Sequence, residues 1–188
     1  MSRSELLLQQ LRAYEPDDPL EAVHRLAMAQ LLSSAEAAFS RGHFVPGHFT
    51  ASCFIIDDGG RLLLHHHRRL DRWLQMGGHV EGDETPGATA LREGSEESGL
   101  NDLALFGGAI FDLDVHSIPA ARGEPAHDHF DVRYLARTSH PEAITIDRAE
   151  SNELAWFGLD RAAALMHGDE SLRVIGKIER LLRERSAS

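Results

Sequence analysis

Three glutamates that lie close together are the residues of this chain best placed to do chemistry. Glu93, Glu96 and Glu97 occupy positions i, i+3 and i+4, so on an α-helix they share one face within about one turn. Like charges at that spacing repel one another. The cluster therefore predicts either a solvated helix face or a binding site for a hard divalent cation, because Mg²⁺ and Mn²⁺ prefer oxygen ligands.

The flanking residues predict that this cluster closes a helix. Thr85 is a suitable N-cap, Pro86 suits the first helical position, and Gly99 is a suitable stop. The carboxylates then project from the last turns, where the helix dipole disfavours negative charge. A bound cation would compensate for that charge, which favours the metal-site interpretation.

The whole motif resembles the box of the Nudix hydrolases. The family's spacing is met by a set of residues that begins and ends with a glycine: Gly78, Glu84, Arg92, Glu93, Glu96, Glu97 and Gly99. The chain departs from the pattern at Gly94, where the family usually has a bulky apolar residue. A glycine inside a helix costs about 0.5–1 kcal/mol relative to alanine, so this position puts the rigidity of the helix in question.

The resemblance implies a role for each matching residue. The ligands of a Mg²⁺ or Mn²⁺ ion would be the Gly77 carbonyl and the side chains of Glu93, Glu96 and Glu97. Arg92 and Glu84 would form an ion pair that braces the loop against the helix. Glu81 matches a position that is often acidic in the family, and we expect it to face the substrate.

The implied reaction is hydrolysis of a pyrophosphate bond in a nucleoside diphosphate linked to another group. The cation would offset charge that develops on phosphate and would lower the pKa of a bound water, and a carboxylate would accept the water's proton. Glu97 is our first choice for that base. Glu153 competes with it, because residues 150–157 resemble the family's downstream loop. The alternative for Glu153 is an ordinary acid on a surface loop.

A second polar constellation lies beyond the box. Polar residues alternate with apolar ones in two segments, so each predicted strand has one polar face: Asp112, Asp114 and His116 in the first, and His127, His129, Asp131 and Arg133 in the second. With residues 117–126 as the connecting loop, a hairpin would pair His116 with His127, Asp114 with His129, and Asp112 with Asp131.

Three interpretations of these faces remain open. The first is a solvated sheet face with cross-strand charge pairs. The second is a wall of the substrate pocket, in which His127, His129 and Arg133 recognise phosphate or a leaving group. The third is a dedicated transition-metal site, because histidine is a common ligand. His79, in the loop beside the expected cation, is either a substrate contact or an exposed loop residue. In the segment 65–67 only the first and third histidines can share a strand face.

Composition narrows the class of protein. A length of 188 residues with 42% hydrophobic residues suits a globular protein. The net charge of -11 argues against binding duplex nucleic acid, which needs a basic patch. We see no apolar run of the roughly 20 residues that a membrane span needs, and no signal-peptide layout. Cys53, the single cysteine, excludes an intrachain disulfide, so we expect a cytoplasmic protein.

The elements that would position these residues begin with two helices. Ser2 with Glu5 predicts a capping box, and Asp18-Pro19 starts a second helix. We expect residues 1–45 to form a helical extension packed on the core, with a homodimer interface as one use for it, and residues 46–188 to form the main domain. A hairpin is predicted from strand 48–56, a turn at 57–60 and strand 61–68. Further strands are expected at 102–115, 127–136 and 153–158, and helices at 162–166 and 171–185.

Strands around a central helix, with helices at the end, favour an α/β fold. The resemblance implies the α/β/α sandwich of the Nudix fold, with a mixed β-sheet. The leading function is a metal-dependent pyrophosphohydrolase acting on a small nucleotide-type substrate. The alternative is a catalytically silent Nudix-fold module that binds a nucleotide or regulates. A Nudix-like isomerase would need a catalytic cysteine, and Cys53 lies in an apolar strand. The substrate stays open, because residues 100–116 contain neither a tyrosine nor a proline that could mark a family subgroup.

Overall fold

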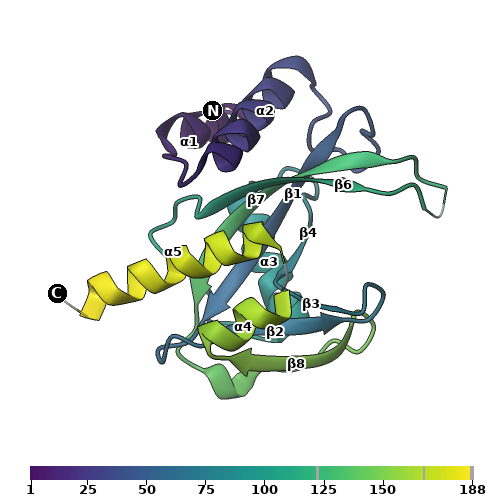
Figure 1. Cartoon of the computed structure of the whole chain (residues 1–188). Coiled ribbons are helices and arrows are strands. Elements are labelled where there is room, and N and C mark those ends of the chain that lie inside the picture. Colours follow the sequence, from purple (N-terminus) through teal and green to yellow (C-terminus); the bar gives the residue numbers. More distant parts are fainter. Residues whose placement is uncertain (122, 167, 187–188) are drawn as a thin grey trace.

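The computed structural model describes residues 1–121, 123–166 and 168–186. Over these residues the strands form one mixed sheet of eight, with helices on both of its faces (Figure 1). The sheet is built around β1 (Gly47–Ile56), which pairs in parallel with β7 (His127–Arg137) and antiparallel with β2 (Leu62–His67) and β4 (Met76–His79). The predicted α/β/α sandwich with a mixed sheet is confirmed.

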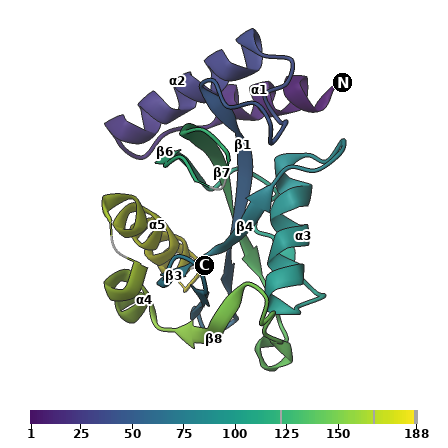
Figure 2. The ribbon, with the colours of Figure 1, turned by 90° about the vertical axis from the view of Figure 1, so that its right-hand side faces the viewer.

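Strand β1 separates two apolar cores. All ten of its residues are buried, as expected for a strand covered on both faces. Cys53 and Ile55 face one core, together with Met76 and Ala90. The intervening residue Phe54 faces the other core, which it shares with side chains of the C-terminal helix. Helix α3 (Pro86–Ser98) lies on the first face, and α4 (Leu159–Met166) and α5 (Asp169–Ser186) lie on the second (Figure 2).

The predicted hairpin is confirmed, whereas the expected strand at 102–115 is wrong. In the hairpin, Ile55 pairs with Leu63 across the 57–60 turn. The expected later strand is divided into β5 (Ala104–Leu105) and β6 (Asp112–Ile118). Gly107 and Gly108 between them have φ values of 67° and 65°, a left-handed conformation that a continuous strand cannot contain. The remaining strands are β3 (Arg72–Leu74) and β8 (Ser151–Phe157), and a short 3-10 helix spans Pro141–Ala143.

The expected pairing of β6 with β7 is also wrong, by two residues. His116 pairs with His129, Asp114 with Asp131, and Asp112 with Arg133. Strand β6 continues to Ile118, which pairs with His127. The connecting loop is therefore shorter than predicted, and each β6 residue pairs two positions further along β7. A shift of two residues keeps every side chain on its face, so the polar face survives although its partners change.

Two helices precede the sheet, and both start as predicted. The capping box of Ser2 and Glu5 begins α1 (Arg3–Ala13), and Asp18 caps α2 (Pro19–Ser34). Their apolar faces are part of the first core, and the buried members from these helices are Leu7, Leu11, Met28 and Leu31. The helices thus pack on the sheet across β6 and β7 (Figure 2). A domain boundary at residue 45 stays a prediction.

A buried charge network joins these helices to α5. Lys177 donates to Glu21 at 2.5 Å and to Asp112 at 3.0 Å. Arg173 donates to Asp112 at 2.8 Å and to Asp18 at 3.3 Å. Glu21 and Asp112 are fully buried, so their charges depend on these cations. The network therefore holds both ends of the chain against β6. Within the described ranges, no helix is long and apolar enough to cross a membrane.

Candidate active site

Helix α3 has the predicted limits, and it presents its acidic end to a loop of the sheet. The Thr85 hydroxyl accepts a hydrogen bond from the Ala88 amide at 3.3 Å. At the other end Gly99, with φ 74°, donates its amide to the Ser95 carbonyl at 2.8 Å. Only a left-handed residue, which favours glycine, closes the helix in this way.

Gly94 does not interrupt the helix, which runs unbroken to Ser98. A Cβ atom at this position would lie 3.0 Å from Leu103 Cδ1 and 3.4 Å from Cys53 Sγ. Neighbouring side chains therefore occupy the space that a larger residue would need. The expected weakness of the helix is offset by this close packing of α3 on β1.

Arg92 joins the loop to the helix through three carboxylates. Its guanidinium lies 3.0 Å from each of Glu84, Glu93 and Glu96. It also donates to the backbone carbonyl of His79 at 3.1 Å. The ion pair with Glu84 has the arrangement that the resemblance implies. These bonds stabilise the charged form of Arg92 and raise its pKa, although burial opposes them.

Glu97 is the most perturbed carboxylate of the site. It is buried and accepts a hydrogen bond from the Gly77 amide at 3.0 Å. Burial raises the pKa of Glu97 to about 9, with further contributions from a hydrogen bond to Glu150 and from the charges of Glu150 and Glu93. Burial also raises the pKa of Glu93, although Arg92 opposes this shift. Several carboxylates that share one buried place are suited to a divalent cation, whose charge would favour their ionised forms.

Gly78 allows this crowding. A Cβ atom there would lie 2.2 Å from Glu93 Oε1 and 2.5 Å from Glu93 Cδ, so any larger residue would displace the carboxylate. The backbone of β4 and the end of α3 thus form a cradle lined by oxygen atoms. Three of the four predicted ligands, Gly77, Glu93 and Glu97, lie at this cradle, whereas Glu96 pairs with Arg92 on the exposed side; their binding of a cation stays a prediction.

The cradle forms part of the lining of a cleft of about 510 Å³. The acidic residues on its walls include Glu81, Glu93, Glu97 and Glu150, and the basic ones are Arg41 and Arg69. His65, His67, His79, His116 and His129 add imidazoles. A cleft lined by both carboxylates and guanidinium groups can hold a divalent cation and the phosphates that it binds.

The structure brings some predicted site residues into this cleft and leaves others outside. His79, Glu81 and His129 line it, as does Glu150. Glu96 does not line it: its side chain is 60% exposed and pairs with Arg92. Glu153 lies on a separate hollow beside Ile144 and Leu154, so its predicted role as the base has no geometric support.

Arg133 and His127 also lie away from the cleft lining. Arg133 is buried and forms ion pairs with Asp131 at 3.0 Å, Asp114 at 2.8 Å and Asp112 at 3.4 Å. Its guanidinium is therefore occupied and is not available to a phosphate. His127 is buried behind His129, with their Nε2 atoms 3.3 Å apart.

Glu150 is the acidic residue that the sequence reasoning missed. Its backbone carbonyl accepts from the Arg68 amide at 2.8 Å, which holds this end of the 144–150 segment beside β2. The pairing of β2 with β8 shifts between His66 and His67, and no sequence signal predicted that irregularity. His65 and His67 were predicted to share a face, and both line the cleft.

A family model described as the NUDIX domain matches residues 46–176. The chain belongs to the Nudix family. A "Probable DHNTP pyrophosphohydrolase" of Lactococcus lactis subsp. cremoris is 31% identical over 137 residues, which cover 72% of this chain and 77% of that protein. The family match and the name of this relative show that the chain is an enzyme of the Nudix pyrophosphohydrolase type, as the sequence predicted.

Two solved Nudix structures show the same fold. An Ap4A hydrolase of C. elegans, in a binary complex, superposes with a TM-score of 0.60 at 20% identity, covering 72% of this chain and 98% of that one. The dihydroneopterin triphosphate pyrophosphohydrolase of E. coli superposes with a TM-score of 0.54 at 23% identity, covering 68% and 91%. Divalent-metal dependence is general in the family, which agrees with the oxygen-lined cradle.

The metal-free protein is expected to lose stability as the pH rises, because of Glu97. A folded-state pKa of about 9, above the ordinary 4.5, means that folding favours the protonated carboxyl. This stabilisation is complete below pH 4.5 and is lost as the pH rises toward 9. Thermal melting in a chelator should show Tm falling from pH 5 to pH 9, with a flatter profile for Glu97→Gln. A wild-type Tm that stays constant over this range would contradict the assignment.

Proposed function

We propose that this protein hydrolyses a pyrophosphate bond in a nucleoside diphosphate linked to another group, with Mg²⁺ or Mn²⁺ held by the cradle. The observation that carries this proposal is the burial of Glu97 against the Gly77 amide, beside Glu93 and Glu150. Such a group of carboxylates is stable in ionised form only with a cation. The ligands would be Glu93, Glu97 and the Gly77 carbonyl. Glu96 would contribute from the solvent-exposed side of the cation.

The chain's own residues position the reaction. When bound, the cation would neutralise phosphate charge and lower the pKa of a water molecule. Glu97 or Glu150 accepts the water's proton, since both lie on the cleft wall. Arg41 and Arg69, which also line the cleft, can bind phosphate oxygens. His79 and His129 have their pKa values lowered by burial, to about 4 and about 3, so they are neutral at pH 7 and present uncharged rings to the cleft.

Glu150, rather than Glu153, is expected to matter for turnover. Glu150→Gln removes a carboxylate that contacts Glu97, so kcat should fall by about 10–100-fold, the scale for a group that supports a metal ligand. Glu153→Gln makes the same chemical change outside the cleft and should leave kcat within about twofold of the wild type. Steady-state hydrolysis at saturating Mg²⁺ measures both. The reverse order of effects would restore Glu153 as the base.

A substrate screen tests the proposed function directly. The panel contains dihydroneopterin triphosphate and diadenosine tetraphosphate, because relatives are named for them, together with ADP-ribose and nucleoside triphosphates. Released phosphate or pyrophosphate is measured with Mg²⁺ or Mn²⁺, and calorimetry measures binding of the same compounds. Turnover of at least one compound supports the enzyme. Tight binding without turnover across the panel would instead support the silent binding module.

The isomerase alternative lacks a reactive thiol. Cys53 is fully buried in β1 against α3. Burial raises the pKa of its thiol to about 12, so it is a poor nucleophile at neutral pH. A cytoplasmic location and a homodimer stay predictions, to be tested by fractionation and by sedimentation.

A further inference from the structure

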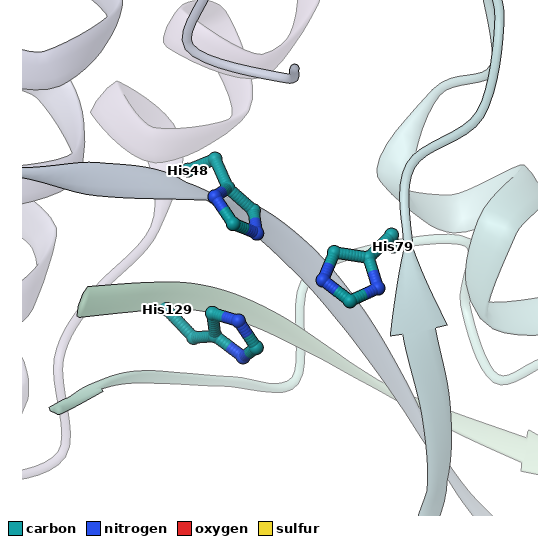
Figure 3. A group of neighbouring side chains, drawn as sticks. All are labelled: His48, His79 and His129. Carbon is teal, nitrogen blue, oxygen red and sulfur yellow. The ribbon is translucent and has the colours of Figure 1, made fainter. Parts of the chain in front are cut away.

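Three histidines from three strands converge beside the cleft. They are His48 on β1, His79 at the end of β4 and His129 on β7, and one ring nitrogen from each lies within 4.8 Å of the others (Figure 3). His48 and His129 are paired neighbours across the parallel strands, with ring centroids 4.9 Å apart. The His79 ring lies 5.1 Å from His48 and 5.3 Å from His129. The sheet register therefore holds the three rings together.

The hydrogen bonds of His48 decide which of its nitrogens is free. Its Nδ1 lies 3.2 Å from the backbone carbonyl of His43. A carbonyl oxygen can only accept, so Nδ1 carries the proton and Nε2 keeps a lone pair. The His48 side chain is fully buried, and its Nε2 has no hydrogen-bond partner among the described residues. A buried polar atom without a partner is costly, unless a ligand satisfies it.

His127 fixes the neighbouring ring in a similar way. Its Nδ1 lies 2.8 Å from the Pro125 carbonyl, so its Nε2 is the acceptor. That Nε2 is 3.3 Å from His129 Nε2, and His129 is then the donor and keeps the lone pair on its Nδ1. Metal-bound histidines commonly donate their second nitrogen to a carbonyl or another acceptor, which orients the ring. Both His48 and His129 have this arrangement.

We propose that His48, His79 and His129 bind a divalent transition metal of the zinc class, at a site separate from the carboxylate cradle. Three imidazoles suit zinc, cobalt, nickel or copper, whereas magnesium prefers oxygen. Three protein ligands leave a fourth position in a tetrahedral site. His79 and His129 also line the cleft, so that position is open to water or to an oxygen atom of a molecule bound there.

The two sites share one structural connection. The His79 carbonyl accepts from Arg92 at 3.1 Å, and Arg92 also holds Glu93. A metal on the His79 ring would therefore order the same segment that carries Gly77 and Gly78. The opposing interpretation is a set of neutral stacked rings beside Phe44, whose ring lies 5.0 Å from that of His127. Metal binding separates the two interpretations.

The test uses the full chain without a histidine tag, stripped of metal with a chelator. Zinc is then added in the presence of millimolar Mg²⁺, which under the proposed function would fill the carboxylate cradle. Elemental analysis gives the stoichiometry, competition with a chromophoric chelator gives the affinity, and the visible spectrum of the Co²⁺-loaded protein reports on imidazole ligation. We expect one zinc per chain and a tetrahedral Co²⁺ spectrum.

Variants assign the ligands. His79→Ala and His129→Ala should each weaken zinc binding by at least about 100-fold, since even loss of a supporting residue costs about 10–100-fold. His140→Ala, an exposed histidine paired with Asp102, is the matched control and should bind like the wild type. Glu97→Gln should also keep its zinc, because it belongs to the other site. Circular dichroism shows whether each variant folds. If His129→Ala misfolds, the zinc affinity of His79→Ala, whose side chain lies at the cleft surface, decides the test.

Two results would overturn the proposal. One is a wild-type protein that retains no zinc and gives no Co²⁺ ligand-field spectrum. The other is zinc that survives His79→Ala and His129→Ala but is lost in Glu97→Gln, since the metal would then occupy the carboxylate cradle.

Discussion

Glu97→Gln is expected to lower kcat by about a thousandfold or more, which corresponds to about 4 kcal/mol of transition-state stabilisation. The amide has the shape of the carboxyl group, and its oxygen can still accept from the Gly77 amide. It lacks the anionic oxygen that a cation needs and the basicity that accepts a proton. The measurement is steady-state hydrolysis of the best substrate from the panel, over a range of Mg²⁺ concentrations.

The same variant should be no less stable than the wild type without metal. Burial and the neighbouring Glu150 and Glu93 disfavour the Glu97 charge, and glutamine removes that charge without changing the packing.

The activity measurement needs a control. Glu142→Gln, in the exposed 3-10 helix, changes an acidic residue outside the cleft and should retain full activity. Wild-type turnover by the Glu97 variant would remove Glu97 from the mechanism.

Lys177→Met is expected to lower the free energy of unfolding by about 3–5 kcal/mol, the range for breaking a buried ion pair from one side. The Lys177 ammonium contacts the carboxylates of Glu21 and Asp112, the Tyr14 hydroxyl and the Phe111 carbonyl. Methionine fills similar volume, so the loss would come from two buried carboxylates that no longer share that cation. Urea unfolding followed by circular dichroism measures the change.

Arg180→Met is the matched control on the same helix. Arg180 pairs with Asp17 at 2.6 Å, but its side chain is 49% exposed, so the loss should stay below about 1 kcal/mol. Adding Glu21→Gln to Lys177→Met should recover part of the stability, because one unpaired charge is removed with its partner. Equal losses of unfolding free energy for Lys177→Met and Arg180→Met would show that burial does not set the strength of these ion pairs.

Local signals in the sequence were sufficient for the elements that carry the cradle. A cap at Thr85, a proline at the first position and a glycine at the end act within one helix, so they predicted α3 at both limits. The 57–60 turn likewise predicted the hairpin of β1 with β2. Glu93, Glu97 and Gly77 could be brought together only through the family resemblance, because their distance in space depends on how β4 pairs with β1.

Features that depend on long-range packing could not be predicted. The polar face of β6 and β7 looked accessible in the sequence, but Arg173 of α5 pairs with Asp112 there, and Arg133 is enclosed by three aspartates. The choice between Glu150 and Glu153 depends on an irregular pairing of β2 with β8. His48 lies 31 residues before His79 and 81 before His129, so only the sheet register reveals their proximity.

The charge network also limits how far this protein can be shortened. The segment that matches the family ends at residue 176, one position before Lys177, and it begins after Glu21. A recombinant fragment trimmed to 46–176 would keep Asp112, Arg133 and Arg173 but would discard Lys177, and it would expose the apolar surface under α1 and α2. We therefore expect the fold of this chain to need the segments on both sides of the matched region, because α1, α2 and Lys177 cover or neutralise groups inside it.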